Sequence, residues 1–113
     1  MDYKIKTAKS FDKEIKRLGK RYASIADDYA KLLLEISANP HLGTDLGGGL
    51  RKIRMAITSK GKGKSGGARV ISFTVVVAVE ENEINLLYIY DKAERSSISK
   101  KEIEELLRLN GLK

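Results

Sequence analysis

The chain has 113 residues and a formal net charge of +7, from 22 Lys and Arg against 15 Asp and Glu, with no cysteine and one histidine, His41. This composition predicts one domain over residues 1–113. It excludes disulfides, thiolate catalysis, cysteine-ligated metals and a two-histidine nuclease, so we expect no metal and no cofactor. The chain has no apolar stretch long enough for a membrane span and no signal-peptide core at its N-terminus, which predicts a cytoplasmic protein with no membrane partner.

A short strand and two helices are predicted in the N-terminal third. Residues 3–6 alternate as in a strand, and an apolar stripe at helical spacing over 10–18 is expected to end at Gly19. The second helix is predicted to begin at Ser24, whose side-chain oxygen is expected to cap it. It should end before Pro40, because the residue before a proline avoids helical geometry. The short link between the helices predicts an antiparallel helical hairpin.

Three strands are predicted after a glycine-rich loop at 41–50. Residues 50–58 alternate between apolar and polar side chains, as in a half-buried strand. Residues 68–79 are rich in β-branched side chains, and residues 84–90 are apolar on both faces, which predicts a central strand. A turn is expected at 81–82. Consecutive strands with short links predict an antiparallel sheet with the two helices packed on one side.

The last helix has the clearest start signal in the chain. Ser99 and Glu102 form a capping box, and Ile98 and Ile103 occupy the positions of a hydrophobic staple. Gly111 is expected to follow its end. The predicted order is β-α-α-β-β-β-α, an α+β fold in which a small, mainly antiparallel sheet carries an N-terminal helical hairpin and a C-terminal helix.

The entire charge excess lies in residues 46–79, which contain seven Lys and Arg and no Asp or Glu. At the centre of this basic block is the glycine-rich loop 60–67, with the sequence KGKGKSGG. Concentrated positive charge on a mobile loop is typical of a polyanion site, above all for nucleic acid. A nucleotide-binding phosphate loop is not expected, because Thr58 stands where its first glycine belongs and a strand follows. The alternative is a solvated hairpin tip whose lysines serve solubility.

Two arginines flank this loop. Arg54 lies on the polar face of the strand that enters it, and Arg69 opens the strand that leaves it, as a cation expected to contribute little to the core. With Lys60, Lys62 and Lys64 they are expected to converge on one phosphate-rich substrate, because Arg binds phosphate in bidentate fashion and Lys adds a mobile point charge.

Tyr88, Tyr90 and Lys92 lie on and just beyond the last predicted strand. The two tyrosines share a strand face. They either pack together in the core, or stack on a base and position a phosphate.

Three segments together are similar to a known family. They are residues 48–54 (GGLRKIR), 60–71 (KGKGKSGGARVI) and 87–94 (LYIYDKAE), and residues 39–43 (NPHLG) and the two-helix start agree with them. The chain resembles the RelE/ParE superfamily of toxin–antitoxin toxins, and within it the HigB-like branch. The resemblance covers nearly the whole chain and implies a small twisted antiparallel sheet flanked by helices.

The resemblance also implies an activity and partners. These are an RNA endonuclease that cuts mRNA on the translating ribosome, and an antitoxin encoded by the adjacent gene, of helix-turn-helix type. By motif position the catalytic candidates are Arg54, Lys62, Lys64, Arg69, Tyr90 and Lys92, and the RNA-binding candidates are Arg51, Lys52 and Lys60. The chain departs from the RelE pattern at Ala93, where an arginine is common, and has no tyrosine in 95–99; Lys92 or Arg95 would then supply that contribution.

The expected mechanism is attack of the RNA 2′-OH on the adjacent phosphorus, with displacement of the 5′-oxygen. Lys62 or Lys64 is the expected base, because ammonium groups held close together favour loss of a proton from one of them. Arg54 and Arg69 would stabilise the charge that grows on the phosphate. Two alternatives stay open: a ParE-like inhibitor of DNA gyrase, and a catalytically inactive RNA- or ribosome-binding module.

Overall fold

The computed structural model describes residues 2–113, apart from the side chain of Asp2. Its elements, in chain order, are β1 (Asp2–Thr7), α1 (Lys9–Arg21), α2 (Ile25–Ala38), β2 (Thr44–Gly47), β3 (Leu50–Met55), the short 3-10 helix η1 (Thr58–Lys60), β4 (Ala68–Ala78), β5 (Glu81–Asp91) and α3 (Lys100–Leu109). Within this described chain, no helix is long and apolar enough to cross a membrane.

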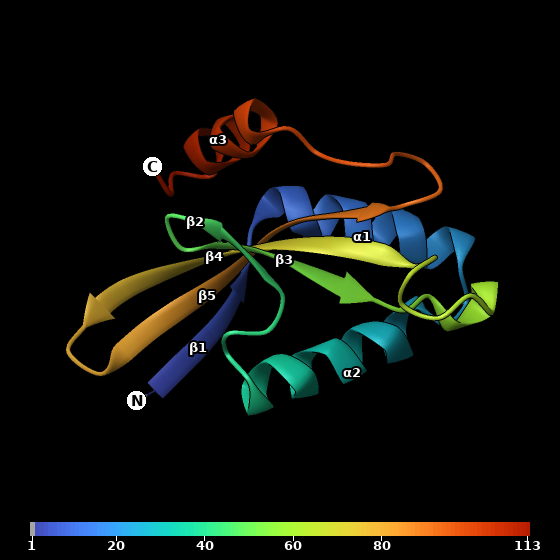
Figure 1. Ribbon diagram of the computed structural model, residues 1–113, viewed down its shortest axis with the longest axis horizontal. Coiled ribbons are helices and arrows are strands. Elements are labelled where there is room, and N and C mark those ends of the chain that lie inside the picture. Colours follow the sequence, from blue (N-terminus) through green and yellow to red (C-terminus); the bar gives the residue numbers. More distant parts are fainter. Residues whose placement is uncertain (1) are drawn as a thin grey trace.

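The five strands form one sheet in the order β1-β5-β4-β3-β2 (Figure 1). β1 runs parallel to β5, and the remaining neighbours are antiparallel, so the α+β fold with a mainly antiparallel sheet is confirmed. β4 and β5 are 11 residues each and form a long hairpin that projects beyond the rest of the sheet (Figure 1). This arrangement places the C-terminal ends of β3 and β5 beside the start of β4, next to the glycine-rich loop 60–67 of the basic block.

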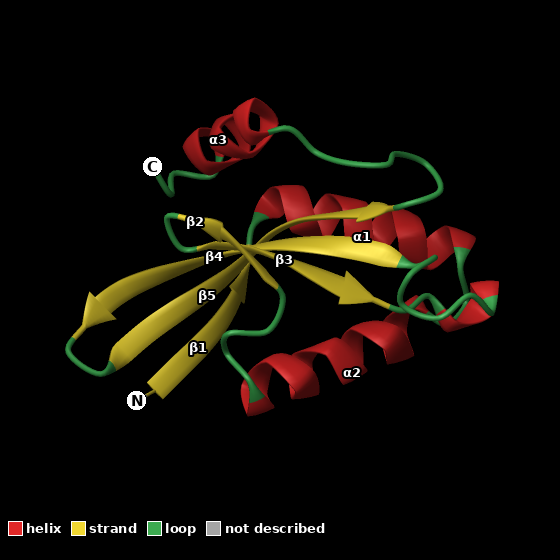
Figure 2. Cartoon of the chain, in the orientation of Figure 1, coloured by secondary structure: helices red, strands yellow, loops and turns green. Residues whose placement is uncertain are grey.

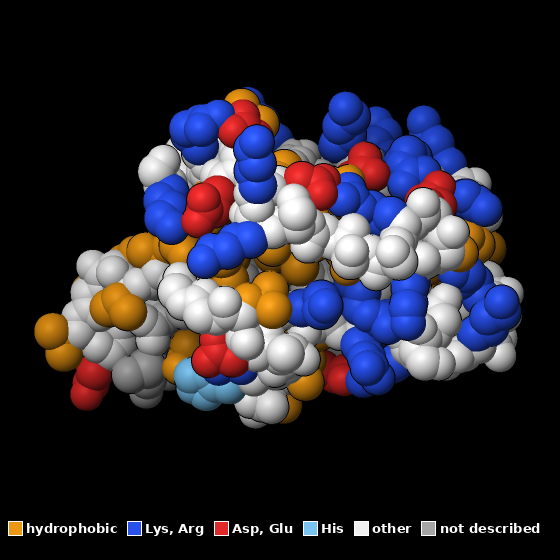
Figure 3. Space-filling model, turned by 45° about the horizontal axis from the view of Figure 1, so that its top comes forward, with side chains coloured by type: hydrophobic (Ala, Val, Ile, Leu, Met, Phe, Trp, Pro, Cys, Tyr) orange, Lys and Arg blue, Asp and Glu red, His pale blue; other side chains and the backbone are white. Residues whose placement is uncertain are grey.

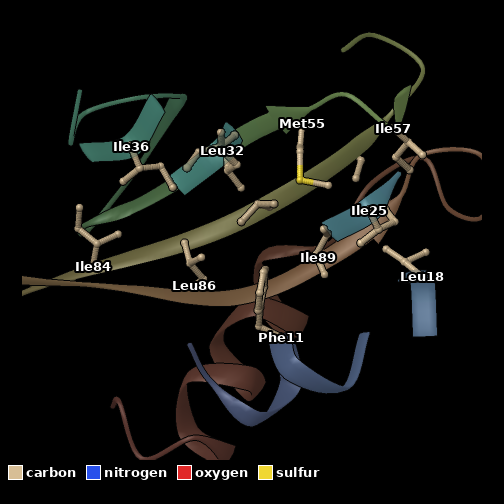
Figure 4. Close-up of a cluster of buried hydrophobic side chains, with 13 residues drawn as sticks. Phe11, Leu18, Ile25, Leu32, Ile36, Met55, Ile57, Ile84, Leu86 and Ile89 are labelled. Carbon is tan, nitrogen blue, oxygen red and sulfur yellow. The ribbon is translucent and has the colours of Figure 1, made fainter. Parts of the chain in front are cut away.

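Helices cover both faces of the sheet, and α2 and α3 lie on opposite sides of it (Figure 2). One core contains Phe11 and Leu18 of α1 and Leu32 of α2, packed against buried strand residues such as Met55 and Ile89 (Figure 4). A second, smaller core lies on the other face and packs α3 against β3, β4 and β5; its buried members are Leu50, Ile71, Leu87, Ile103 and Leu107. The sheet is therefore buried on one face by α1 and α2, and on the other face only over the part that α3 covers.

Two helix boundaries differ from the sequence prediction. Gly19 does not end α1, which continues to Arg21, because the amide of Tyr22 still bonds the carbonyl of Leu18. Ser24 precedes α2 as predicted but does not cap it. Its backbone is near-helical, with φ −85° and ψ −3°, whereas a capping residue is normally extended. Its hydroxyl donates to Asp28 instead.

The strand boundaries also differ in three places. β2 was missed, because its sequence TDLG lacks alternation and all four residues are exposed at the sheet edge. β3 ends at Met55 rather than at 58, where the chain turns into η1. The turn of the long hairpin lies at 79–80, with Glu80 at φ 64°, and not at 81–82. Residues 81–82 extend β5 instead, because they pair with β1.

The C-terminal helix begins as predicted. The Ser99 hydroxyl accepts a hydrogen bond from the Glu102 amide at 3.1 Å, and the Glu102 carboxylate accepts one from the Ser99 amide at 3.2 Å. The capping box is therefore confirmed, and Gly111 follows the helix with φ 69°.

Candidate active site

Three predicted site residues lie side by side across the sheet. Arg54 of β3 pairs with Arg69 of β4, and Arg69 pairs with Tyr90 of β5. Residues paired in this way present their side chains on the same face of neighbouring strands. The neighbouring row on that face contains Lys52, Ile71 and Tyr88, and Ile71 and Tyr88 belong to the core under α3. The Arg54–Arg69–Tyr90 row thus lies on the α3 face, next to the part that the helix covers.

A cavity of about 280 Å³ opens over this row. Its lining residues are Thr44, Lys52, Arg54, Arg69, Tyr90, Lys92 and Ser96. Seen from one side, Lys and Arg side chains gather over α3 and over the half of the molecule away from the tip of the β4–β5 hairpin (Figure 3). The lining combines four cations, one phenol and two hydroxyls, without a carboxylate, which is the composition of a phosphate-binding site.

Arg69 is buried, contrary to the expectation of a surface cation: it is 6% exposed. Its guanidinium donates to the backbone carbonyls of Lys64 at 3.0 Å, Ser65 at 3.2 Å and Ala68 at 3.1 Å. Among residues 3–113, whose side chains are described, no carboxylate pairs with it. Backbone carbonyls orient the charged group but leave its full positive charge available to an anion.

Tyr90 is 2% exposed, and its hydroxyl has no hydrogen-bond partner among the described residues. Burial raises the pKa of this phenol, and the opposing effect of the nearby Arg69 and Arg95 is smaller. The phenol therefore stays protonated at neutral pH and can donate a hydrogen bond. Buried hydroxyls normally have partners, so a ligand atom in the cavity is a natural acceptor.

The lysines of loop 60–67 do not line this cavity. Lys60 turns away from it and forms an ion pair with Asp91 at 2.6 Å. Lys64 pairs with Glu35 of α2 at 2.7 Å, and the stem of Lys62 lies against Gly66. The structure therefore brings together four of the six catalytic candidates and separates Lys62 and Lys64 from them.

The RNA-binding candidates divide in the same way. Lys52 lines the cavity, two residues before Arg54 on the same strand. Arg51 points to the opposite face, where its guanidinium donates to the carbonyl of His41 at 2.9 Å and lies 3.9 Å from Asp45. Strand alternation alone separates Arg51 from Lys52 and Arg54, and this was readable from the sequence.

Arg95 lies beside the cavity without lining it. Its guanidinium carbon lies 5.6 Å from the centre of the Tyr90 ring, and the group donates to both carboxylate oxygens of Glu102 at 2.9 and 2.8 Å. Glu102 also belongs to the capping box of α3. Arg95 thus links the start of the C-terminal helix to Tyr90.

Thr44 and Ser96 line the cavity but were not predicted as site residues. Both are ordinary hydroxyl residues in segments expected to be loops, and they reach the site through β2 and through the segment after β5. The spacing of apolar residues in the sequence does not indicate that either residue belongs to a site.

Lys52 and Lys92 lie on opposite sides of the row of Arg54, Arg69 and Tyr90. β3 and β5 run in the same direction, because each is antiparallel to β4. Lys52 precedes the row on β3, and Lys92 follows it at the end of β5, where its amide donates to the carbonyl of Gly67. Such an arrangement can hold a phosphodiester on two arginines, with one amine on each side of the phosphorus.

One comparison with known proteins bears on this geometry. Residues 4–112 match the family model described as the RelE toxin of the RelE/RelB toxin–antitoxin system. The match begins within β1, spans β2 to β5 and the three helices, and includes every residue that lines the cavity.

Proposed function

The chain belongs to the RelE toxin family, and from this premise we propose that it inhibits translation by cutting messenger RNA on the ribosome. The toxin of a toxin–antitoxin system has a cognate antitoxin as its partner. We further propose that this antitoxin is a helix-turn-helix protein encoded by the adjacent gene.

The row of Arg54, Arg69 and Tyr90 is the observation that carries the proposal. Two guanidinium groups without a carboxylate partner among residues 3–113, and a buried phenol without a hydrogen-bond acceptor among the described residues, face one cavity. These groups offer donors to the non-bridging oxygens of a phosphodiester. They would also stabilise the extra negative charge of the pentacoordinate transition state, because their positions are fixed before the substrate binds.

The proposed reaction is attack by the 2′-oxygen of the RNA on the adjacent phosphorus. A base takes the proton of the 2′-OH, the new P–O bond forms, and the bond to the 5′-oxygen breaks as an acid protonates that oxygen. The products are a 2′,3′-cyclic phosphate and a free 5′-OH. An in-line displacement of this kind requires the base and the acid on opposite sides of the phosphorus.

Lys52 and Lys92 are the lining residues that we assign to these two proton transfers. An arginine in the cavity is unsuitable, because a guanidinium does not lose its proton in proteins. The pKa of Tyr90 is raised by burial, which makes the phenol a donor and a poor base. One lysine in its amine form accepts the proton of the 2′-OH and the other, as ammonium, donates to the leaving oxygen. Lys62 and Lys64, outside the cavity, are retained as contacts to the RNA or ribosome.

The test is a cleavage assay with purified ribosomes and a defined mRNA, using charge-preserving variants. Lys52→Arg and Lys92→Arg keep the positive charge but cannot exchange a proton, so they should bind programmed ribosomes with the wild-type affinity and cleave at least about 100-fold more slowly. Lys31→Arg, at an exposed position of α2, is the matched control and should cleave normally. Wild-type toxin that binds ribosomes but never cuts mRNA would refute the proposal and favour an inactive ribosome-binding module.

The gyrase-inhibitor alternative makes a separate prediction. An inhibitor of that kind should block DNA supercoiling by purified gyrase and leave mRNA intact. Convergence of four cations on one cavity supports the nuclease, because an inhibitor that binds a protein does not require such a cavity.

A further inference from the structure

Lys60 and Asp91 form the most deeply buried ion pair of the described chain. The side chain of Asp91 is 0% exposed and that of Lys60 is 11% exposed, with 2.6 Å between the ammonium nitrogen and the carboxylate. Asp91 accepts two further hydrogen bonds, from the Tyr22 hydroxyl at 2.6 Å and the Ala93 amide at 2.9 Å. Lys60 also donates to the carbonyl of Gly66 at 2.9 Å. A lysine with these contacts has little of its ammonium left for an RNA phosphate.

Asp91 organises the chain segment that holds one side of the cavity. It follows Tyr90 directly and precedes Lys92. Its side chain binds the amide of Ala93, and its carbonyl accepts hydrogen bonds from the amides of Glu94 at 2.9 Å and Arg95 at 3.1 Å. The turn that presents Lys92 to the cavity and Arg95 to the Tyr90 ring is therefore built on this one residue.

The other contact of Lys60 organises the opposite side. Gly66 belongs to the loop whose carbonyls at Lys64 and Ser65 accept the hydrogen bonds of the Arg69 guanidinium. The next residue of the loop, Gly67, accepts a hydrogen bond from the Lys92 amide at 3.1 Å. One ammonium group thus joins the segment that orients Arg69 to the segment that orients Lys92.

We propose that Lys60 is a positioning residue, which fixes Arg69, Tyr90 and Lys92 relative to one another through the buried pair with Asp91, and does not bind RNA. This inference rests on the proposed function of the cavity. It reassigns the first lysine of the basic loop from substrate contact to internal support. A misplacement of about 1 Å at a reacting group can slow a reaction about 100-fold, so loss of the pair should act on the rate of the chemical step.

The experiment compares Lys60→Met with Lys62→Met, at an exposed loop lysine proposed to contact RNA, and uses Lys31→Met, at an exposed position of α2 outside the cavity, as the control. Single-turnover cleavage is measured at saturating ribosomes, together with ribosome affinity as a function of salt. Lys60→Met should cleave about 10- to 100-fold more slowly, with affinity within twofold of wild type and an unchanged salt dependence. Lys62→Met should bind ribosomes more weakly and lose part of its salt dependence, as expected for a lysine that contacts phosphate. Lys31→Met should match wild type in both cleavage and salt dependence.

Two further variants keep the test valid if Lys60→Met folds poorly. Lys60→Arg retains a cation for Asp91 and should recover part of the lost rate. The double variant Lys60→Met with Asp91→Asn removes both buried charges, should fold, and should still cleave slowly. The proposal would be overturned if a folded variant that lacks a cation at position 60 still cleaved at the wild-type rate. So would a variant whose only defect is weaker, less salt-dependent ribosome binding.

A readout without RNA separates this inference from the proposed function. In protein labelled with ¹⁵N-arginine, the guanidinium resonances of Arg69 report its orientation directly. They should shift or broaden in Lys60→Met and remain as in wild type in Lys62→Met. If wild type cuts no mRNA while Arg69 responds to Lys60 alone, the function fails and the positioning role holds. If the Arg69 resonances do not change when Lys60 is replaced, the positioning role is refuted, whether or not the protein cleaves mRNA.

Discussion

Tyr90→Phe is expected to make the protein more stable and less active. The Tyr90 hydroxyl is buried and lacks a partner among the described residues. An unpaired buried polar group costs about 1–3 kcal/mol, and phenylalanine keeps the ring while removing that group. No cavity beyond the size of one hydroxyl is created. The free energy of unfolding should therefore rise by about 1–3 kcal/mol, and the melting temperature by about 4 °C for each kcal/mol in a protein of this size.

The same change should slow cleavage if the phenol donates to a phosphate oxygen. A hydrogen bond to a charged group contributes about 1.5–3 kcal/mol, which corresponds to roughly a 10- to 150-fold lower rate. Opposite signs of the two effects are the diagnostic result. A residue that is purely structural would lose stability and activity together.

Tyr88→Phe is the matched control, on the same strand face two residues earlier. The Tyr88 side chain is only partly buried, and it interacts with Arg95, so the variant should lose up to about 1 kcal/mol of stability rather than gain it. Unfolding is followed by urea denaturation and activity by ribosome-dependent cleavage. Lower stability of Tyr90→Phe than of wild type would refute the reasoning about its hydroxyl, and full activity would refute its contact with the substrate.

Three further predictions concern the framework of the site. Gly67→Ala should destabilise the protein by about 1–3 kcal/mol and reduce cleavage, because a Cβ there would lie 2.2 Å from the Met55 carbonyl oxygen; a variant as stable as wild type in urea would contradict this. Acid should destabilise the fold: burial alone would raise the pKa of Asp28 and Asp91, but hydrogen-bond donors around them hold both below the ordinary 3.8. Their contribution is therefore complete above pH 3.8 and lost as the pH falls further, and Asp28→Asn should show a smaller loss of stability between pH 5 and pH 2.5. Ser99→Ala removes the confirmed cap of α3 and should cost about 1 kcal/mol by the same denaturation measurement, whereas an unchanged midpoint would show that α3 does not depend on its cap.

Elements with a local cause were predictable from the sequence. The capping box fixed the start of α3, and the β-branched run of 68–79 identified β4 almost to the residue. Errors arose where a distant partner decides the outcome. Residues 81–82 look like a turn, yet they extend β5 because β1 pairs with them. Gly19 is a different case: it looks like a helix end, yet the local hydrogen bond from the Tyr22 amide to the Leu18 carbonyl carries α1 on to Arg21.

The candidate site was predictable in its strand residues and not in its loop. Arg54, Arg69 and Tyr90 belong to strands whose pairing follows from a simple hairpin register, so their convergence was within reach of the sequence. The course of loop 60–67 is set by tertiary contacts that its glycines do not reveal. Lys60 bonds Asp91, 31 residues further along, and Lys64 bonds Glu35, 29 residues earlier. Counting lysines in a loop therefore could not tell which of them face the substrate.

The bonding partners of each Lys or Arg distinguish cations that support the fold from cations available to bind a ligand. Position in the sequence distinguishes them less well. Lys60, Lys64 and Arg95 each bond a carboxylate of the same chain, so much of their charge is already neutralised. The four cations that line the cavity pair with no carboxylate among the described side chains of residues 3–113, and in Arg69 this holds for a group that is almost entirely buried. Keeping a buried cation without a counter-ion costs free energy. That cost is relieved when an anion enters the cavity, so the arrangement that lowers the stability of the free protein is the one that favours binding of a phosphodiester.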